Sequence, residues 1–195
     1  MKKLSLLVFA ALFEVLTFGQ TKWTVDPVHS SVSFTVTHLV ISEVEGAFKS
    51  FSGTILSDKP DFSDANVNFT VNVNSINTDN QMRDNHLKSP DFFDAEKYPQ
   101  MTYKGTSFKK LSGNKYELNG DLTIHGITKP VKFDVTYGGT ADDGMGNTKA
   151  GFKATTTINR FDYGLKWDKL TEAGGMVVDQ DVTINLRLEF AKAKA

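Results

Sequence analysis

The sequence predicts an all-β protein of about eight antiparallel strands with one short helical insertion. Apolar and polar residues alternate with a period of two along most of the chain from Trp23 onward, as expected for a sheet with one apolar and one polar face. Turn-forming residues separate these stretches, and one segment, residues 79–98, lacks the alternation. A length of 195 residues favours a single domain.

The strands are assigned from this alternation. In residues 31–38, for example, Val32, Phe34 and Val36 alternate with Ser and Thr. The pattern predicts strands at residues 31–38, 66–76, 131–137 and 181–190, and shorter strands at 45–56, 101–111, 115–125 and 149–161. The outward positions are Asn, Thr, Lys, Asp and Glu, so the sheet exterior is expected to lie in water, the reverse of an outer-membrane barrel.

The connections carry residues typical of tight turns, at 112–114, 138–139 and 142–147. Gly46, Gly53 and Gly105 lie inside strand-like stretches, where we expect bulges or bends. The 142–147 loop resembles a calcium-binding loop only faintly, because it lacks the bidentate Glu at the required offset. We therefore interpret it as a hairpin connection.

The segment without alternation is predicted to be the helical insertion. Asp79 or Asn80 provides an N-cap for a short helix that begins near Gln81. Pro90 ends this helix or starts another turn. We expect the insertion to lie across the sheet or across its mouth.

Two architectures suit an all-antiparallel chain of this length, a sandwich or a closed barrel. Closure removes the exposed strand edges. A barrel of eight strands has an interior just wide enough for packed side chains or for one slender ligand. Periodicity alone leaves the content of the interior open.

The first 19 residues differ from the rest of the chain. Lys2 and Lys3 precede an apolar run that Glu14 interrupts, and Thr17 and Gly19 are small enough for a cleavage site. We interpret residues 1–19 as a secretory signal peptide and residues 20–195 as the mature domain. The alternative is a membrane anchor, but a spanning helix needs ~20 apolar residues, and this run is shorter. No stable membrane insertion is expected after cleavage.

Composition excludes several other classes. The formal net charge is -1, without the basic excess typical of a nucleic-acid-binding protein. The chain has no Cys, which excludes disulfides, a thiol nucleophile and a lipoprotein cysteine. Its four His show no metal-ligand spacing, and we find no nucleophile-elbow or phosphate-loop motif. We predict no catalytic residue, no metal and no cofactor.

Several blocks of residues resemble the YceI-like family, in the order in which that family has them. The blocks are Trp23-Thr24-Val25-Asp26-Pro27-Val28-His29-Ser30 with residues 32–38, Ser75-Ile76-Asn77-Thr78, residues 83–89, 92–94 and 98–99, residues 120–131, and Ile158-Asn159-Arg160-Phe161-Asp162-Tyr163-Gly164-Leu165. Each block is weak evidence by itself, but together they span nearly the whole mature chain. The chain departs from the family pattern at Glu14 and at Pro90, which shortens the predicted helix.

The resemblance implies an eight-stranded antiparallel, lipocalin-like β-barrel with a short helical insertion. It implies a long apolar interior that binds a polyisoprenoid lipid, such as an isoprenoid quinone or a polyprenyl phosphate. It also implies a periplasmic or secreted location in a bacterium, in agreement with the predicted signal peptide. The expected function is that of an exported carrier or storage protein and not of an enzyme.

The candidate ligand-binding residues are first the apolar side chains that parity directs inward. These are Phe34, Val36, Phe69, Val71, Val73, Phe133, Ile158 and Ile184. From parity alone a packed core is the simpler interpretation, whereas the resemblance implies an unfilled middle. Burying a lipid tail there is favourable by roughly 0.8 kcal/mol for each CH₂ group.

Polar candidates flank these stripes. His38 shares parity with Phe34 and could donate a hydrogen bond to a quinone carbonyl, or it could be an ordinary rim residue. Arg83 and His86, with Lys88, could meet a phosphate or quinone head, or Arg83 could belong to a local network with Asp84 and Asp79.

Arg160 is expected to stabilise the rim by pairing with Asp162 or Asp168. Two other functions remain as alternatives, an enzyme acting on an isoprenoid, for which His38 is the candidate base, and a stress-related structural protein with a filled barrel. A homodimer through an exposed first or last strand is a further alternative.

Overall fold

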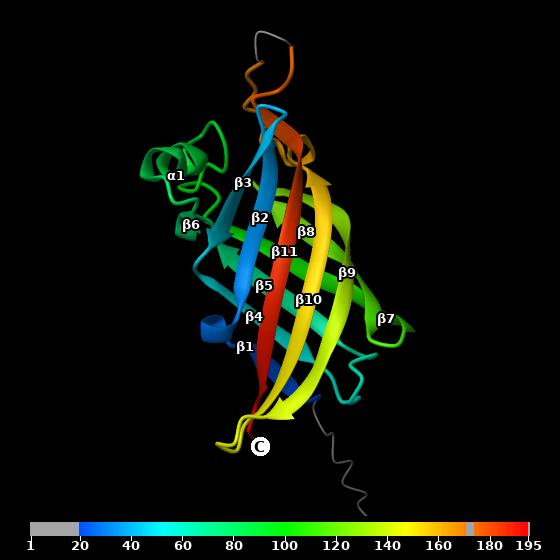
Figure 1. Cartoon of the computed structure of the whole chain (residues 1–195). Coiled ribbons are helices and arrows are strands. Elements are labelled where there is room, and N and C mark those ends of the chain that lie inside the picture. The colour runs from blue at the N-terminus through cyan, green and yellow to red at the C-terminus, as the bar shows by residue number, and fades with distance from the viewer. Residues whose placement is uncertain (1–19, 171–173, 195) are drawn as a thin grey trace, which may run out of the picture.

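The computed structural model describes residues 20–170 and 174–194. It consists of one antiparallel sheet that closes into an eight-strand barrel with one α-helix, which confirms the predicted fold class (Figure 1). The signal peptide expected at residues 1–19 lies outside the described residues. No helix in the described part of the chain is long and apolar enough to cross a membrane.

The strands of the sheet follow the chain in order, and three of the barrel strands are interrupted. The segments are β1 (Lys22–Val25), β2 (Ser31–His38), β3 (Ser42–Phe48), β4 (Phe51–Leu56), β5 (Asn66–Asn72), β6 (Ile76–Asn77), β7 (Gln100–Ser112), β8 (Lys115–Ile124), β9 (Ile127–Asp142), β10 (Thr148–Asn159) and β11 (Val178–Lys192). β1 and β2 both pair with β11. On the other side, β1 pairs with β4, and β2 pairs with β3. In turn, β4 pairs with β5, and β3 pairs with β6. The segments β1 and β2, β3 and β4, and β5 and β6 therefore each form one long, interrupted strand.

Closure leaves the first and last strands without a free edge. β1 pairs with β4 on one side and with β11 on the other. β11 pairs with β10 and with the β1–β2 strand. Neither strand offers the exposed edge that the homodimer alternative requires, because both sides of each strand are hydrogen-bonded.

The interruptions have local causes. Between β1 and β2, Pro27 removes a backbone donor and begins the 3₁₀ helix η1 (Pro27–His29), which Asp26 caps by accepting from Val28 N at 3.0 Å. After β5, Asn72 caps the 3₁₀ helix η2 (Val73–Ser75) in the same way. The predicted strand at 66–76 therefore ends at Asn72 and resumes only as the short β6.

The predicted turn at 138–139 is wrong, because β9 continues through both glycines. Gly139 pairs with Gly151 and Tyr137 pairs with Phe152, so Gly138 is an extra residue in the ladder. Gly139 has a φ of 109°, which favours glycine. The two glycines thus form a bulge that bends the sheet, and β9 is longer than the predicted 131–137.

The helical insertion is confirmed as α1 (Gln81–Lys88). Asn80 is the N-cap and accepts from Arg83 N at 3.0 Å, whereas Asp79 precedes it with a φ of 57°. The helix ends before Pro90, as expected. In Figure 1 it lies beside β3 and β6 at the end of the barrel that we call the upper rim.

The upper rim comprises the β2–β3 turn (residues 39–41), α1, the β8–β9 turn (residues 125–126), the 3₁₀ helix η3 (Arg160–Tyr163) and the loop that follows it. The C-terminus and the β9–β10 loop lie at the opposite end, the lower rim (Figure 1).

The lower rim is closed by aromatic side chains. Phe62, in the loop between β4 and β5, packs against Trp23 and Phe152 with ring centroids 5.1 and 5.2 Å apart. Tyr116 donates a hydrogen bond from its hydroxyl to Asp61 O at 2.8 Å, which holds this loop across the end of the barrel. The packed part of the core therefore lies at this end, and space remains above it.

Candidate ligand-binding cavity

A cavity with a volume of about 200 Å³ occupies the barrel interior. Its lining is apolar apart from Ser33, Thr102, Tyr103 and Arg160. Seven of the predicted inward residues line it, namely Phe34, Val36, Phe69, Val71, Phe133, Ile158 and Ile184. Strand parity therefore places these side chains correctly, and their contact with a ligand stays a prediction.

The cavity opens toward the upper rim. Inward residues of the upper half, such as Val36, Ile158 and Val182, are only half-buried, although they face the lumen. Inward residues near the lower rim, such as Phe152 and Phe190, are buried. The walls of the upper half are therefore accessible to solvent, while the Phe62 side chain closes the lower end.

Two glycines make room for the rings of Phe34 and Phe69 against the barrel wall. Phe34 pairs with Gly46, and a Cβ atom at Gly46 would lie 2.3 Å from Phe34 Cζ. Phe69 pairs with Gly53 in the same way, and a Cβ there would lie 2.2 Å from Phe69 Cδ2. Each ring therefore lies along the wall in the space that a side chain would fill.

Of the three glycines at which bulges or bends were expected, only Gly105 adjoins a register shift. Gly46 and Gly53 lie in regular ladders, and they accommodate the two phenylalanine rings instead.

Two predicted inward residues do not line the cavity. Val73 is buried, but it belongs to η2 and not to the strand, so strand parity does not apply to it. His38 lies at the upper end of β2, where it pairs with Val178. His38 is half-buried at the end of this strand, beyond the residues that line the cavity.

Arg83 takes part in a hydrogen-bond network within the chain, and its contact with a head group stays a prediction. Its guanidinium donates to Thr78 Oγ1 and Thr78 O, both at 2.7 Å. The buried Asp84 accepts from Thr78 N at 2.9 Å and from Thr78 Oγ1 at 2.6 Å. Arg83 and Asp84 are thus joined through Thr78, without the predicted participation of Asp79, and this network fixes α1 over the barrel.

α1 contributes to the cavity through other residues. Leu87 lines it directly, as do Phe92 and Phe93 after the helix. His86 does not line it. Its Nε2 atom lies 3.0 Å from Asp91 Oδ2, and its ring packs edge-on against Phe92 and Trp167 at centroid distances of 5.0 and 5.5 Å.

Trp167, which the sequence analysis did not single out, packs against Phe92 as well, at a centroid distance of 5.3 Å. The three rings form an aromatic cluster at the upper rim. No periodic signal marks Trp167, because it lies in an irregular loop.

Arg160 is the charged residue of the lining, and it is only 4% exposed. Its guanidinium donates to four backbone carbonyls, at Leu165 (2.6 Å), Trp167 (2.8 Å), Asp179 (2.8 Å) and Val178 (2.9 Å). The expected pairing with Asp162 or Asp168 is wrong, because the ion pairs among the described residues do not include Arg160.

Carbonyl oxygens can replace carboxylates here because the loop after η3 wraps around the side chain. Burial lowers the pKa of Arg160, and the negative charges of Asp168 and Asp179 partly oppose that shift. The Arg160 side chain thus ties the loop to β11 and places a positive charge at the upper end of an apolar cavity.

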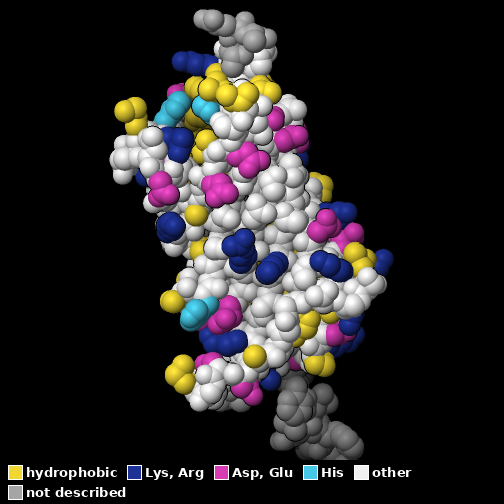
Figure 2. All heavy atoms as spheres, viewed as in Figure 1, with side chains coloured by type: hydrophobic (Ala, Val, Ile, Leu, Met, Phe, Trp, Pro, Cys, Tyr) yellow, Lys and Arg dark blue, Asp and Glu magenta, His cyan; other side chains and the backbone are white. Residues whose placement is uncertain are grey.

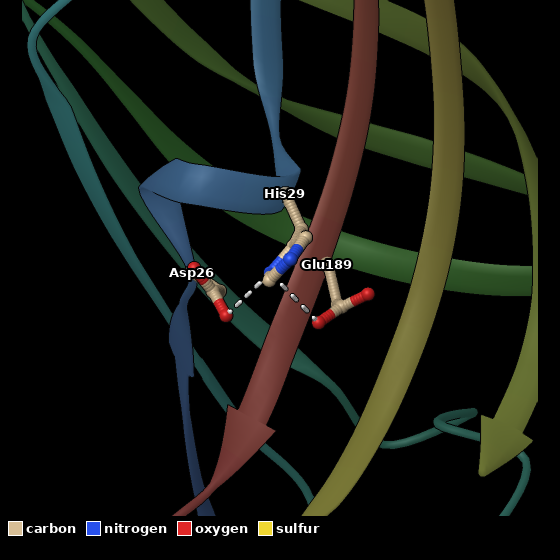
Figure 3. Close-up of side chains that lie close together, drawn as sticks. All are labelled: Asp26, His29 and Glu189. Atoms are coloured by element: carbon tan, nitrogen blue, oxygen red, sulfur yellow. Dashed lines mark hydrogen bonds and ion pairs between the residues drawn. The ribbon is translucent and has the colours of Figure 1, made fainter. Parts of the chain in front are cut away.

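A second cluster of titratable groups lies on the outer wall, and Figure 3 shows three of its members. Asp26 Oδ2 lies 3.1 Å from His29 Nδ1, which lies 3.7 Å from Glu189 Oε1. The Lys149 ammonium lies 2.7 Å from Asp26 Oδ2 and 3.2 Å from Glu189 Oε1.

The Lys149 ammonium therefore occupies the position that a metal ion would need between the two carboxylates. The hydrogen bonds from Lys149 and His29 lower the pKa of Asp26. We interpret the cluster as a clamp that joins η1 to β10 and β11.

A closed antiparallel barrel with an apolar lumen that opens at one end defines a protein of the small-ligand-binding class. The YceI-like domain model matches residues 23–190, and the chain therefore belongs to the YceI-like family. This confirms the resemblance found in the sequence.

Relatives and solved structures agree with this assignment. A UPF0312 protein of Staphylococcus aureus strain N315 is 39% identical over 172 residues, which are 88% of this chain and 98% of the relative. The Campylobacter jejuni YCEI protein is 34% identical with a TM-score of 0.70, covering 82% of this chain and 90% of that chain. Burkholderia cenocepacia BcnA is 28% identical with a TM-score of 0.72, and the match covers 85% of this chain and 98% of that chain.

A domain from Saccharophagus degradans that is described as polyisoprenoid-binding has the same fold. Its TM-score is 0.63 at 16% identity, and the match covers 88% of this chain and 98% of that domain.

Proposed function

We propose that the protein binds one long-chain polyisoprenoid lipid, an isoprenoid quinone or a polyprenyl phosphate, inside its barrel, as an exported carrier or storage protein. The observation that carries the proposal is the apolar cavity that opens at the upper rim and ends at Phe62. The family and the description of the Saccharophagus degradans domain support lipid binding in a barrel. The export is proposed from the signal-like residues 1–19, with a periplasmic or secreted location.

The shape of the cavity suits a slender chain. Its wall follows β11 from Val178 to Phe190, and a strand rises ~3.3 Å per residue, so the lining extends ~40 Å along the strand. Strands of small barrels tilt by roughly 35–45°, which leaves ~30 Å along the barrel axis. Each five-carbon unit removed from water contributes ~4 kcal/mol, so the tail supplies most of the affinity.

The orientation of the lipid follows from the two ends of the cavity. The lower end is aromatic hydrocarbon around Phe62, which suits the end of the tail. The upper end has the Arg160 charge, which carbonyl dipoles solvate without neutralising it. A carbonyl or phosphate oxygen of the head group would be favoured beside this guanidinium and near solvent.

Catalysis has less support. The enzyme alternative needs a general base in the lumen, and its candidate was His38. His38 lies at the rim, outside the cavity lining.

Mass spectrometry of an organic extract of the natively purified protein tests the proposal. We expect a stoichiometric polyisoprenoid in the wild type and much less in Ala154→Trp, because Ala154 lines the cavity and the new indole fills it. Lys153→Trp is the matched control, since Lys153 is the neighbouring exposed residue of β10. An extract without lipid, together with no uptake of added quinone or polyprenyl phosphate, would overturn the proposal.

A further inference from the structure

We propose that the upper rim is a docking surface for a lipid bilayer, into which the β2–β3 turn and residues 164–170 after η3 dip reversibly. The inference rests on the proposed lipid binding, and it adds the surface from which the lipid is taken up or to which it is delivered. The bound occupant is a phospholipid membrane.

Exposed apolar side chains gather at this end of the molecule. Val40 and Ile41 are 67% and 86% exposed at the tip of the β2–β3 turn, with Leu39 beside them. Met82 of α1 and Leu170 of the loop after η3 are 82% and 65% exposed. Figure 2 shows hydrophobic side chains clustered at the top of the molecule, where the upper rim lies. Elsewhere in the described chain the large exposed apolar residues are scattered singly, at Val28, Leu111 and Met145.

The backbone of the turn makes this choice of residues unusual. Leu39 and Val40 have φ angles of 52° and 66°, in the left-handed region that favours Asn and Gly. A β-branched residue is disfavoured there, and its apolar side chain gains nothing from exposure to water. Transfer of the Val40 and Ile41 side chains from water into the interface of a bilayer is favourable.

This apolar tip is continuous with the cavity wall. Leu39 N donates to Val177 O at 2.9 Å, and the next residue, Val178, lines the cavity. The loop that carries Leu170 also contributes Leu165 to the lining. A lipid tail that moves between bilayer and cavity would therefore remain against apolar side chains.

The charges of the rim are mixed. Lys166 and Lys169 are exposed in the loop after η3, and Lys88 ends α1. Four exposed carboxylates lie in the same region, at Glu43, Asp91, Asp162 and Asp168. We therefore expect docking to depend little on anionic lipid, with the apolar side chains providing most of the binding.

The test compares the natively purified wild type with a triple variant, Leu39→Asn, Val40→Gly and Ile41→Thr. These substitutions give the turn residues that its backbone favours, so the variant is expected to fold. Flotation with vesicles of phosphatidylcholine, with and without phosphatidylglycerol, measures partitioning. We expect a decrease of at least about tenfold in the variant. Met145→Ser, at the exposed lower rim, is the matched control and is expected to bind vesicles like the wild type.

A second measurement locates the contact. The chain has two Trp, and a Trp23→Phe variant leaves Trp167 of the upper rim as the fluorophore. Brominated phospholipids should quench its emission when vesicles are added. Lipid extracted from the triple variant is quantified separately, so that loss of docking is distinguished from loss of the cavity function.

Equal vesicle binding by the wild type and the triple variant, or no binding by either, would overturn the proposal. Concentration-dependent self-association of the wild type without vesicles, abolished in the triple variant, would also overturn it, because the tip would then be an interface between copies.

Discussion

The ring of Phe34 lies over Gly46, its partner across the β2–β3 ladder, in the space that a side chain at position 46 would need. The ring therefore lies along the barrel wall and leaves the lumen open. The volume of the cavity therefore depends on Gly46, because any side chain at this position would have to displace the Phe34 ring.

Gly46→Ala is expected to force the Phe34 ring toward the lumen. Overpacking of this kind destabilises a fold by roughly 1–3 kcal/mol, and the displaced ring would also occupy space intended for lipid. We expect a lower urea midpoint and a smaller lipid yield in an organic extract.

Gly151→Ala is the matched control, because a Cβ there meets nothing within 4 Å and the residue lies in strand β10. Phe34→Leu combined with Gly46→Ala should restore part of the lipid binding, because the added Cβ would still lie 2.8 Å from Thr78 Cγ2. Unchanged binding by Gly46→Ala alone would show that the ring can move without entering the cavity.

The hydrogen bonds between Asp84 and Thr78 anchor α1, and their loss should change the rate of amide hydrogen exchange in the helix. Asp84→Ala leaves the buried Thr78 N–H without its acceptor, and such a loss destabilises by about 1–3 kcal/mol. We expect faster hydrogen exchange in α1 and faster release of bound lipid, because Leu87, Phe92 and Phe93 lose their fixed position over the cavity. Gln81→Ala, an exposed change in the same helix, should alter neither rate.

The fold was predictable where the chain follows one local rule. Alternation located the barrel strands, and the cap at Asn80 and the stop before Pro90 located α1. Parity placed Phe34 and Ile184 in the lumen because the ladder between β2 and β11 is regular at these positions.

The features that could not be predicted depend on contacts between residues far apart in the sequence. Parity does not tell where the cavity ends, so it missed that His38, the last residue of β2, lies outside the lining. Parity failed for Val73 because Asn72 begins a 3₁₀ turn. The carbonyl partners of Arg160 lie in a loop and on β11, so no spacing along the chain revealed them. The role of Gly46 required the ladder register, which one strand does not specify.

The Asp26 clamp predicts a pH dependence of stability. Hydrogen bonds from Lys149 and then His29 lower the pKa of Asp26 below its ordinary value of 3.8. A lowered carboxyl pKa in the folded state contributes stability above pH 4 that is lost as the pH falls through the folded pKa. The pKa of Lys149 is raised above 10.5, chiefly by Asp26, so its contribution is lost only as the pH rises beyond that value.

Asp26→Asn should therefore lower the free energy of unfolding by about 1–2 kcal/mol at pH 7. The difference from the wild type should shrink below about pH 4. Urea titrations at several pH values measure it, and Glu96→Gln, an exposed carboxylate, serves as the control. A difference that stays constant down to pH 2 would contradict the assigned pKa shift.

Arg160 combines a structural role with a proposed ligand contact, and substitutions can separate the two. Arg160→Met removes the donor of four buried or half-buried carbonyl acceptors and should destabilise the fold by at least about 3 kcal/mol. Arg160→Lys keeps the charge but not the planar array of donors, so it should restore only part of that loss.

The head-group contact is measured separately, as the ratio of affinities for polyprenyl phosphate and the uncharged polyprenol. That ratio should fall in Arg160→Met, persist in part in Arg160→Lys, and stay unchanged in Arg187→Met, an exposed arginine of β11. An unchanged ratio in a folded Arg160→Met protein would assign this arginine to the rim structure alone.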